Sequence, residues 1–175
     1  RFIVYSNGGH GIAPAQTSCQ YGKPFALEAA IIAEGYTFNK WAVNNNTFNA
    51  GASITCNYAN LGVYNGSVTI TATWNSTTYP VAFDANGGTG GQTATVQAAY
   101  NQPMPAISSE APVNTGYTFM GWYDNASYLS GTQYYNANGV GTRVYDKTTG
   151  TTLYAGWTPN IITLVYDANG HGTAP

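Results

Sequence analysis

The stretch GYTFMGW at residues 116–122 has a near copy, GYTFNKW, at residues 35–41. Tyr, Phe, Thr and Trp favour β-strands, and strand alternation places Tyr117 and Phe119 on one face. The Trp that ends the stretch has the opposite parity, so either a β-bulge at Gly121 intervenes or this Trp packs in a different layer. The stretch therefore predicts one half-buried strand in each of two related units.

Further motifs flank both copies in the same order, and the spacing between matching motifs grows slightly along the chain, as small loop insertions in the second copy would produce. They are Asn7-Gly8-Gly9 and Asn86-Gly87-Gly88, YGKPF at 21–25 and YNQPM at 100–104, and Trp74 and Trp157. The closing LVYDANGHGTAP, residues 164–175, then repeats the opening strand and turn. We therefore expect the chain to be a segment of a longer tandem array.

A period of about 80 residues is long enough for each copy to fold as a separate small domain. We expect repeat 1 at residues 1–77, repeat 2 at residues 78–158, and the first strand and turn of a truncated repeat 3 at residues 159–175. Because that third copy lacks its remaining strands, we expect residues 161–166 to be disordered or to be captured by a sheet edge.

Alternation also predicts the closing strand of each copy. In SVTITATW, residues 67–74, apolar residues alternate with Thr, and TTLYAGW, residues 151–157, follows a similar pattern. We expect Trp74 and Trp157 to be core residues that pack against the GYTF strands. PFALEAAIIAEG, residues 24–35, has Pro at its start and Gly at its end, which predicts a helix that is shorter or distorted in the second copy.

Composition excludes two classes of partner. Only 7% of the 175 residues are charged and the net charge is −2, so the chain has no basic surface for nucleic acid. No apolar run approaches the roughly 20 residues of a membrane span, so we expect no membrane insertion of this segment. Fifteen Tyr, four Trp and 21 Gly, with few strong helix formers, favour a mainly β chain.

The order of the motifs carries a resemblance to a known family. An opening strand, DANGG at 84–88, Y-x-x-P, GYTFxGW and a closing LYAGW resemble the Listeria-Bacteroides repeat, the tandem module of the internalin B repeat region in bacterial surface proteins. The first copy departs by having Lys40 for the Gly of GYTFxGW and Ser6-Asn7 for Asp-x-Asn. The resemblance implies a mainly β (α+β) chain of tandem β-grasp-like domains, each a small twisted sheet with a short helical segment. It also implies an extracellular place on a bacterial cell surface.

Residues suited to catalysis or metal binding do not gather into a motif. The seven carboxylates form no repeated pair, and His10 and His171 lie in GHG turns without the neighbours that a zinc site needs, so we expect both to be solvated turn side chains. Asp84 and Asn86 imitate the start of a calcium loop, but the fifth and twelfth positions hold Gly and Thr. An Asn-Gly turn capped by the Asp side chain is the simpler interpretation. We expect no enzymatic activity, no cofactor and no metal.

The two cysteines predict a pair. Cys19 aligns with Ala98 and Cys56 with about Asn136, so the second copy lacks both cysteines together. Joint absence is what a disulfide between Cys19 and Cys56 predicts. Two independent buried thiols remain the alternative, because the extracellular setting that favours a bridge is implied only by the resemblance.

A group of tyrosines in the second copy is the candidate ligand surface: Tyr123, Tyr128, Tyr134 and Tyr135. Planar rings with hydroxyl tips suit sugar faces or protein partners, and the alternative is that they are strand and core residues. We expect a structural or adhesive stalk or spacer whose partners are neighbouring repeats, with a host-surface protein or glycan as candidate ligand. The alternatives are a glycan-binding module and a segment of a self-assembling surface filament, because few charges guard the strand edges.

Overall fold

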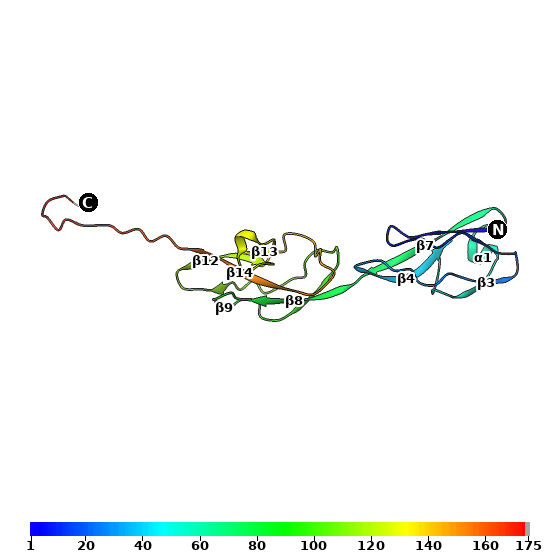
Figure 1. Cartoon of the computed structure of the whole chain (residues 1–175), viewed down its shortest axis with the longest axis horizontal. Helices are drawn as coiled ribbons and strands as arrows, with labels where there is room; N and C mark the ends of the chain where they lie inside the picture. Colours follow the sequence, from blue (N-terminus) through cyan, green and yellow to red (C-terminus); the bar gives the residue numbers. More distant parts are fainter. Residues whose placement is uncertain (174–175) are drawn as a thin grey trace. The chain divides into compact units, whose positions relative to one another are not determined.

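The computed structural model describes residues 1–173, which fall into two compact units (Figure 1). The first unit comprises Arg1–Pro80 with Gln97–Pro103 and Val144–Gly150. The second comprises Val81–Val96, Met104–Arg143 and the described residues from Thr151 onward. The first unit thus includes three stretches that our repeat boundaries assign to repeat 2, residues 78–80, 97–103 and 144–150, and those boundaries stay a prediction.

A five-stranded mixed sheet lies at the centre of the first unit. Its strands are β1 (Phe2–Ser6), β2 (Thr17–Ser18), β4 (Tyr36–Val43), β5 (Asn46–Phe48) and β7 (Ser67–Ser76), in the order β2-β1-β7-β4-β5. β1 runs parallel to β7, and β4 pairs with the other edge of β7 in antiparallel fashion. A small antiparallel sheet and one turn of helix accompany it: β3 (Pro24–Ala26), β6 (Ser53–Thr55) and α1 (Tyr58–Leu61).

A second five-stranded sheet repeats this arrangement. Its strands are β8 (Thr78–Asp84), β10 (Val96–Ala99), β12 (Tyr117–Tyr123), β13 (Gln133–Asn136) and β14 (Thr151–Pro159), in the order β10-β8-β14-β12-β13. β8 is parallel to β14, and β12 is antiparallel to β14. The remaining elements are β9 (Thr89–Gly90), β11 (Pro112–Val113) and the 3₁₀ turn η1 (Tyr128–Ser130). The prediction of a mainly β chain with tandem sheets is confirmed, with very little helix.

The predicted helix at residues 24–35 is absent, so that prediction was wrong. β3 occupies its first three residues, and the Leu27 N–H then donates to the carbonyl O of Ala52 at 2.9 Å. These tertiary hydrogen bonds hold the backbone extended. The segment still buries Leu27 and packs Ile31 against the core, while Ile32 is 90% exposed. The corresponding segment of the second copy, residues 103–116, forms no helix either.

A β-bulge interrupts the GYTF strand in both sheets and explains the parity of its Trp. Pairing with the closing strand shifts register between Phe119 and Gly121 in β12, and the same shift follows Phe38 in β4. Gly121 has φ +126°, a conformation that glycine adopts at little cost. The extra residue turns the following Trp inward, and Trp41 and Trp122 are both buried. The bulge alternative is therefore confirmed.

The closing tryptophans, Trp74 and Trp157, face the GYTF strands but are half-buried, not the core residues we predicted. Their rings pack against Phe38 and Phe119, with centroids 5.8 Å and 5.5 Å apart. Each indole N–H donates to a carbonyl O in the turn after the opening strand, at 2.8 Å and 3.0 Å respectively. Each ring therefore ties the closing strand to that turn.

The cores lie where the sheets bury their alternate residues. The first contains Ile3, Tyr5, Leu27, Trp41, Val43, Ile54, Leu61, Ile70 and Ala72. Around the second sheet the buried residues include Val81, Met104, Trp122, Tyr134, Tyr135, Leu153 and Ala155. Aromatic rings supply much of the apolar area in both, as the high Tyr and Trp content allows.

Candidate functional site

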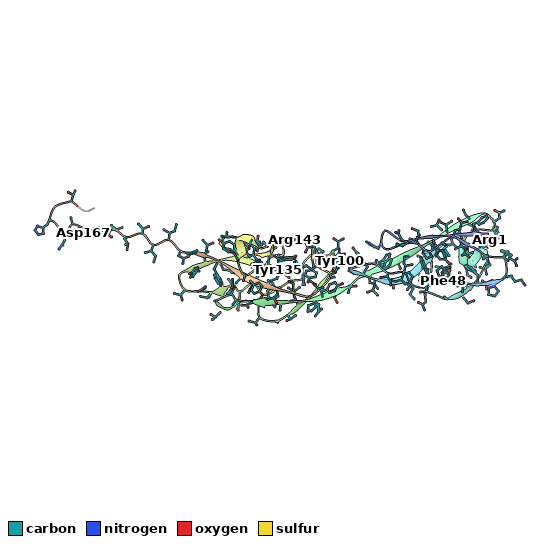
Figure 2. All side chains as sticks on the ribbon, in the orientation of Figure 1. Arg1, Phe48, Tyr100, Tyr135, Arg143 and Asp167 are labelled. Atoms are coloured by element: carbon teal, nitrogen blue, oxygen red, sulfur yellow. A yellow bond between two sulfur atoms is a disulfide. The ribbon has the colours of Figure 1, made fainter. Side chains whose placement is uncertain are left out.

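Tyr134 and Tyr135 were expected on a ligand surface, but both are core residues. They are consecutive in β13, and their side chains are 1% and 0% exposed. Successive side chains of a strand point to opposite faces, so both faces of β13 are covered. The Tyr135 hydroxyl donates to the carbonyl O of Pro105 at 2.8 Å, and the Arg143 guanidinium lies 5.0 Å from the centre of the Tyr134 ring (Figure 2). The surface interpretation was wrong for these two residues.

Tyr123 and Tyr128 are half-buried and form an edge-to-face pair with ring centroids 5.4 Å apart. The Tyr128 hydroxyl shares a hydrogen bond of 2.9 Å with the Thr158 hydroxyl. Burial raises the pKa of the Tyr123 phenol, with a smaller contribution from Tyr128. The rings lie over Gly156 of β14, where a Cβ would be 2.7 Å from Tyr123. The four tyrosines are therefore divided between a core and a strand face, and they do not form one surface.

Alkaline pH is expected to destabilise the second unit through Tyr135. Burial raises the pKa of this phenol above its ordinary value of 10.0. A raised folded-state pKa contributes stability that is present below the unfolded-state pKa and is lost as pH rises above about 10. Urea unfolding at pH 7 and at successive alkaline values measures the loss. Tyr135→Phe should cost about 1 kcal/mol at pH 7, through its lost hydrogen bond, and should flatten the alkaline decline. An unchanged decline in that variant would show that another group is responsible.

An exposed aromatic surface lies instead in the first unit, at Tyr21, Tyr58 and Tyr64. The rings of Tyr58 and Tyr64 are stacked, with centroids 4.5 Å apart, and are 47% and 70% exposed. The Arg1 guanidinium lies 4.7 Å from the centre of the Tyr21 ring and donates two hydrogen bonds to the carbonyl O of Tyr64. Sequence reasoning missed this surface. Its signal was the position of Tyr64 just before an Asn-Gly turn, where side chains seldom enter a core.

The DANGG turn is an Asx turn and not a calcium loop. The Asp84 carboxylate accepts the Asn86 backbone N–H at 2.8 Å, and Asn86 is left-handed at φ +51°. The Asn86 amide donates to the carbonyl oxygens of Ala126 and Ala155, at 2.8 Å and 2.9 Å. The Asp84 side chain thus caps the turn, and the Asn86 side chain anchors the turn to Ala126 and to Ala155 of β14. Among residues 1–173 no three His, Cys, Asp or Glu side chains gather as a metal site would require.

The equivalent turn of the first copy is shifted by one residue from our alignment of Asn7 with Asn86. Ser6 takes the place of Asp84, since its hydroxyl accepts the Gly8 N–H at 3.4 Å. Gly8, at φ +61°, therefore holds the left-handed position of Asn86. The hydrogen bonds of the two closing tryptophans, to Asn7 and Ala85, show the same shift.

His10 is packed in its turn and is not the solvated side chain that we expected. It stacks on Tyr36 with ring centroids 3.8 Å apart and meets Trp74 edge-on at 6.0 Å. His171 is exposed. In the second copy Gly88 occupies the position of His10, and a Cβ there would lie 2.5 Å from the Trp157 ring.

Asp84→Ala is expected to cost the second unit about 1 kcal/mol, because the turn loses the acceptor that holds Asn86 in its left-handed conformation. Chemical denaturation followed at the second unit measures this loss. Asp167→Ala is the matched control: its carboxylate accepts the Asn169 N–H at the same 2.8 Å, but the neighbouring apolar side chains are exposed. Equal losses in the two variants would contradict the role assigned to Asp84.

Comparison with known families settles what these paired sheets are. A model of the Listeria-Bacteroides repeat domain matches residues 3–72 and again residues 79–156. The chain belongs to the Listeria-Bacteroides repeat family. The predicted resemblance is thereby confirmed, and the chain carries two tandem copies of the repeat.

Two further comparisons found similar proteins. A putative Gly-rich membrane protein of Evansella cellulosilytica is 25% identical over 169 residues, which are 94% of this chain and 17% of that protein. The chain thus spans less than a fifth of its relative's length. Streptococcal High Identity Repeats in Tandem (SHIRT) domains 3–4 from a cell surface protein align with 91% of this chain and 99% of theirs, at 15% identity and a TM-score of 0.25. Within residues 1–173, no helix has the length and apolar character needed to cross a membrane.

A disulfide links Cys19 and Cys56 in the first Listeria-Bacteroides repeat, with Cα atoms 6.0 Å apart. The Cys56 N–H donates to the carbonyl O of Lys23, and the Tyr145 N–H donates to that of Gln102, both at 2.9 Å. Tyr145 is therefore the counterpart of Cys56, and the alignment with Asn136 was wrong because the second copy has a longer loop. The second repeat fills the place of the bridge with buried Tyr145 and Ala98.

The segment expected to open a third Listeria-Bacteroides repeat forms no strand in its described part. Its alignment with the start of the second repeat is nevertheless clear. The Asn160 N–H donates to the carbonyl O of Gly116, and the Thr77 N–H donates to that of Gly35, both at 2.9 Å, so Asn160 corresponds to Thr77. Leu164 and Tyr166 therefore correspond to the core-facing residues of β8. The apolar side chains Ile161, Ile162, Leu164, Val165 and Tyr166 are 61–94% exposed. Residues 174–175 of the expected repeat lie outside the described residues.

Proposed function

We propose that the chain is a structural part of a bacterial cell-surface protein, a stalk or spacer that holds an adhesive part away from the cell, and that it is not an enzyme. The observation that carries this proposal is the tandem pair of Listeria-Bacteroides repeats. The name of the Evansella relative, a membrane protein, supports a place at the cell envelope. The Cys19–Cys56 disulfide supports an extracellular setting, where such bonds persist.

The use of the polar side chains also supports a structural role. The Asp84 carboxylate holds its own turn, and the Asp124 carboxylate accepts the Thr132 N–H at 2.7 Å. The indole N–H of Trp41 donates to the carbonyl O of Glu28 at 2.9 Å. These groups satisfy backbone partners, which is what structural polar groups do, and a general acid or base would need to be presented to a substrate.

The spacer role is tested by shortening the surface protein that contains the chain. Deleting residues 78–160 joins Thr77 to Ile161, which have equivalent neighbours, and so removes one whole period. The part of the protein beyond the deletion is then expected to stand closer to the cell, measured as the height of a site-specific fluorophore above the membrane. Replacing residues 78–160 by a second copy of residues 1–77 should restore the height. An unchanged height after the deletion would contradict the spacer role.

Glycan binding is a second candidate function, and the stacked, exposed rings of Tyr58 and Tyr64 are the observation that favours it. Isothermal titration of the purified chain against a panel of bacterial and host glycans tests this candidate. Binding should be lost in Tyr64→Ala and retained in Tyr123→Ala, because Tyr123, in β12, is half-buried against Gly156 of β14. Binding that survives Tyr64→Ala, or no binding to any glycan, would contradict it.

Filament formation through exposed strand edges stays a further prediction. One edge is partly covered, since residue Gly141 forms a β-bridge with Tyr135 of β13. Sedimentation at increasing protein concentration tests for assembly, and a monomer throughout would contradict it.

A further inference from the structure

The ring of Tyr36 lies between two other rings of the first unit. The His10 ring stacks on one side, with centroids 3.8 Å apart, and the Tyr100 ring meets Tyr36 edge-on at 5.4 Å, with planes 86° apart. Tyr100 belongs to the first unit because that unit takes in residues 97–103. Its backbone N–H donates to the carbonyl O of Thr77 at 2.9 Å. Gly35, Tyr36 and Thr77 thus form a seat for one tyrosine, here called the tyrosine socket.

Gly35 is essential to this socket. It has φ +76°, and a Cβ at this position would lie 2.2 Å from the Cδ1 atom of Tyr100. No side chain can fit there unless the Tyr100 ring leaves. A second hydrogen bond, 3.3 Å from the Asn101 side-chain amide to the Tyr36 hydroxyl, holds the turn that carries Tyr100. The socket therefore recognises a tyrosine together with its turn.

The second unit contains the same socket with its surface exposed. Gly116, at φ +83°, corresponds to Gly35, and the Asn160 N–H donates to its carbonyl O as Thr77 does to that of Gly35. The Thr118 hydroxyl donates to the Asn160 side chain at 2.6 Å, matching the Thr37–Thr77 hydroxyl pair. A Cβ on Gly116 would meet no atom within 4 Å, and Tyr117, the counterpart of Tyr36, is 44% exposed.

The chain also carries an exposed turn of the kind that such a socket accepts. Tyr21 is the counterpart of Tyr100, because the residues that follow them, Gly22 and Asn101, are both left-handed and make equivalent backbone hydrogen bonds. The Gly22 N–H donates to the carbonyl O of Cys56 at 2.8 Å, and the Asn101 N–H donates to that of Tyr145 at 2.7 Å. Tyr21 is 61% exposed, with only Arg1 over its ring among the described contacts.

We infer that Gly116, Tyr117 and Asn160 form a docking surface for the Tyr-x-x-Pro turn of another copy of this repeat. The connection along the chain agrees with this occupant. Asn160 corresponds to Thr77, so residues 161–166, which follow Asn160, correspond to residues 78–83, which follow Thr77 and open the second repeat. The next opening strand would carry its repeat, and with it the next such tyrosine, to this surface. The inference rests on the proposed role as a tandem module and adds the contact by which one repeat would hold the next.

The test extends the whole chain by a third repeat. In the register that matches Asn160 with Thr77, Pro175 corresponds to Gln92, so a second copy of residues 93–160 is appended after Pro175. We expect the appended tyrosine's backbone N–H to exchange about tenfold or more slowly than that of Tyr21. The Tyr117 ring should become as protected from solvent as that of Tyr36, and the second unit should unfold at a higher denaturant concentration than in the original chain.

Two substitutions separate docking from simple folding of the added repeat. Gly116→Ala and Tyr→Ala at the appended copy of Tyr100 should each abolish the increase in unfolding midpoint. Gly90→Ala is the matched control, since Gly90 has φ +74° and a Cβ there would meet no atom within 4 Å, and it should lower the midpoint equally in the short and extended chains. A third repeat that folds but leaves the midpoint and the Tyr117 ring unchanged would overturn the docking surface and leave the spacer proposal intact.

A second measurement covers the case in which the added repeat does not fold. Tyr100→Ala in the original chain empties the socket that is filled in the structure, and the Tyr36 ring should then gain solvent contact while the rest of the first sheet keeps its exchange protection. If solvent contact of Tyr36 is unchanged, the tyrosine does not hold the socket, and the inference is overturned by that result alone.

Discussion

Trp122→Ala is expected to remove most of the stability of the second unit. The side chain is fully buried, and its ring packs edge-on against Phe83 at 5.1 Å and Phe119 at 5.5 Å. Truncating a buried Trp costs about 3–5 kcal/mol through lost transfer energy and the cavity left behind. A small domain has about 5–10 kcal/mol in total, so most of its stability would be lost. Chemical denaturation followed by the near-ultraviolet signal of each unit measures the effect.

Met120→Ala is the matched control for this variant. Met120 is the extra residue of the bulge, two positions from Trp122, and its side chain is partly exposed. We expect it to cost less than about 1 kcal/mol, as surface substitutions usually do. A similarly small loss for Trp122→Ala would mean that the bulge does not deliver the ring into the core.

Removing the disulfide is expected to have the second large effect, and only in the first unit. Cys19 and Cys56 are 37 residues apart, and a loop of this length contributes about 4 kcal/mol in the chain-entropy account. The variant with both Cys19→Ser and Cys56→Ser should therefore lose most of the stability of the first unit. Denaturant unfolding with and without reductant measures this, and intact mass after alkylation verifies the state of the thiols.

The second repeat supplies the control for the disulfide. Its unfolding should not respond to reductant, because Ala98 and Tyr145 replace the two cysteines there. Introducing that pair into the first repeat, as Cys19→Ala with Cys56→Tyr, should recover part of the loss through buried apolar area. Two alkylatable thiols in the untreated, folded protein would contradict the bridge.

The parts of the fold that could be predicted from sequence are those that depend on local pattern. The closing strand at residues 67–74 and the GYTF strand at residues 35–38 were both predicted, and the structure pairs them in the first repeat. The predicted strands at residues 151–157 and 116–122 pair in the same way in the second repeat. The parity of Trp122 indicated a bulge, because a change of face within one strand has few other causes. The Asp84 carboxylate was predicted to cap its turn because an Asx turn needs only residues two positions apart.

The errors came from tertiary context. Residues 24–35 have helical signals, but backbone hydrogen bonds to a distant strand outweigh weak helix propensity. Tyr134 and Tyr135 look like a surface pair because adjacent strand residues seldom face two interiors, and nothing local shows that a later loop covers the outer face. The tyrosine socket at Tyr36 could not be predicted at all, since it joins Tyr36 to Tyr100, which is distant in the sequence.

The parallel pairing of β1 with β7, and of β8 with β14, has a mechanical consequence. The chain enters each repeat at the start of one strand and leaves it at the end of its parallel neighbour, so a pull on the two ends drags these strands past each other lengthwise. Their inter-strand hydrogen bonds are then loaded together and must fail together, instead of opening one at a time as in a hairpin pulled from its open end. In the spacer role proposed above, each repeat would therefore resist stretching along the chain.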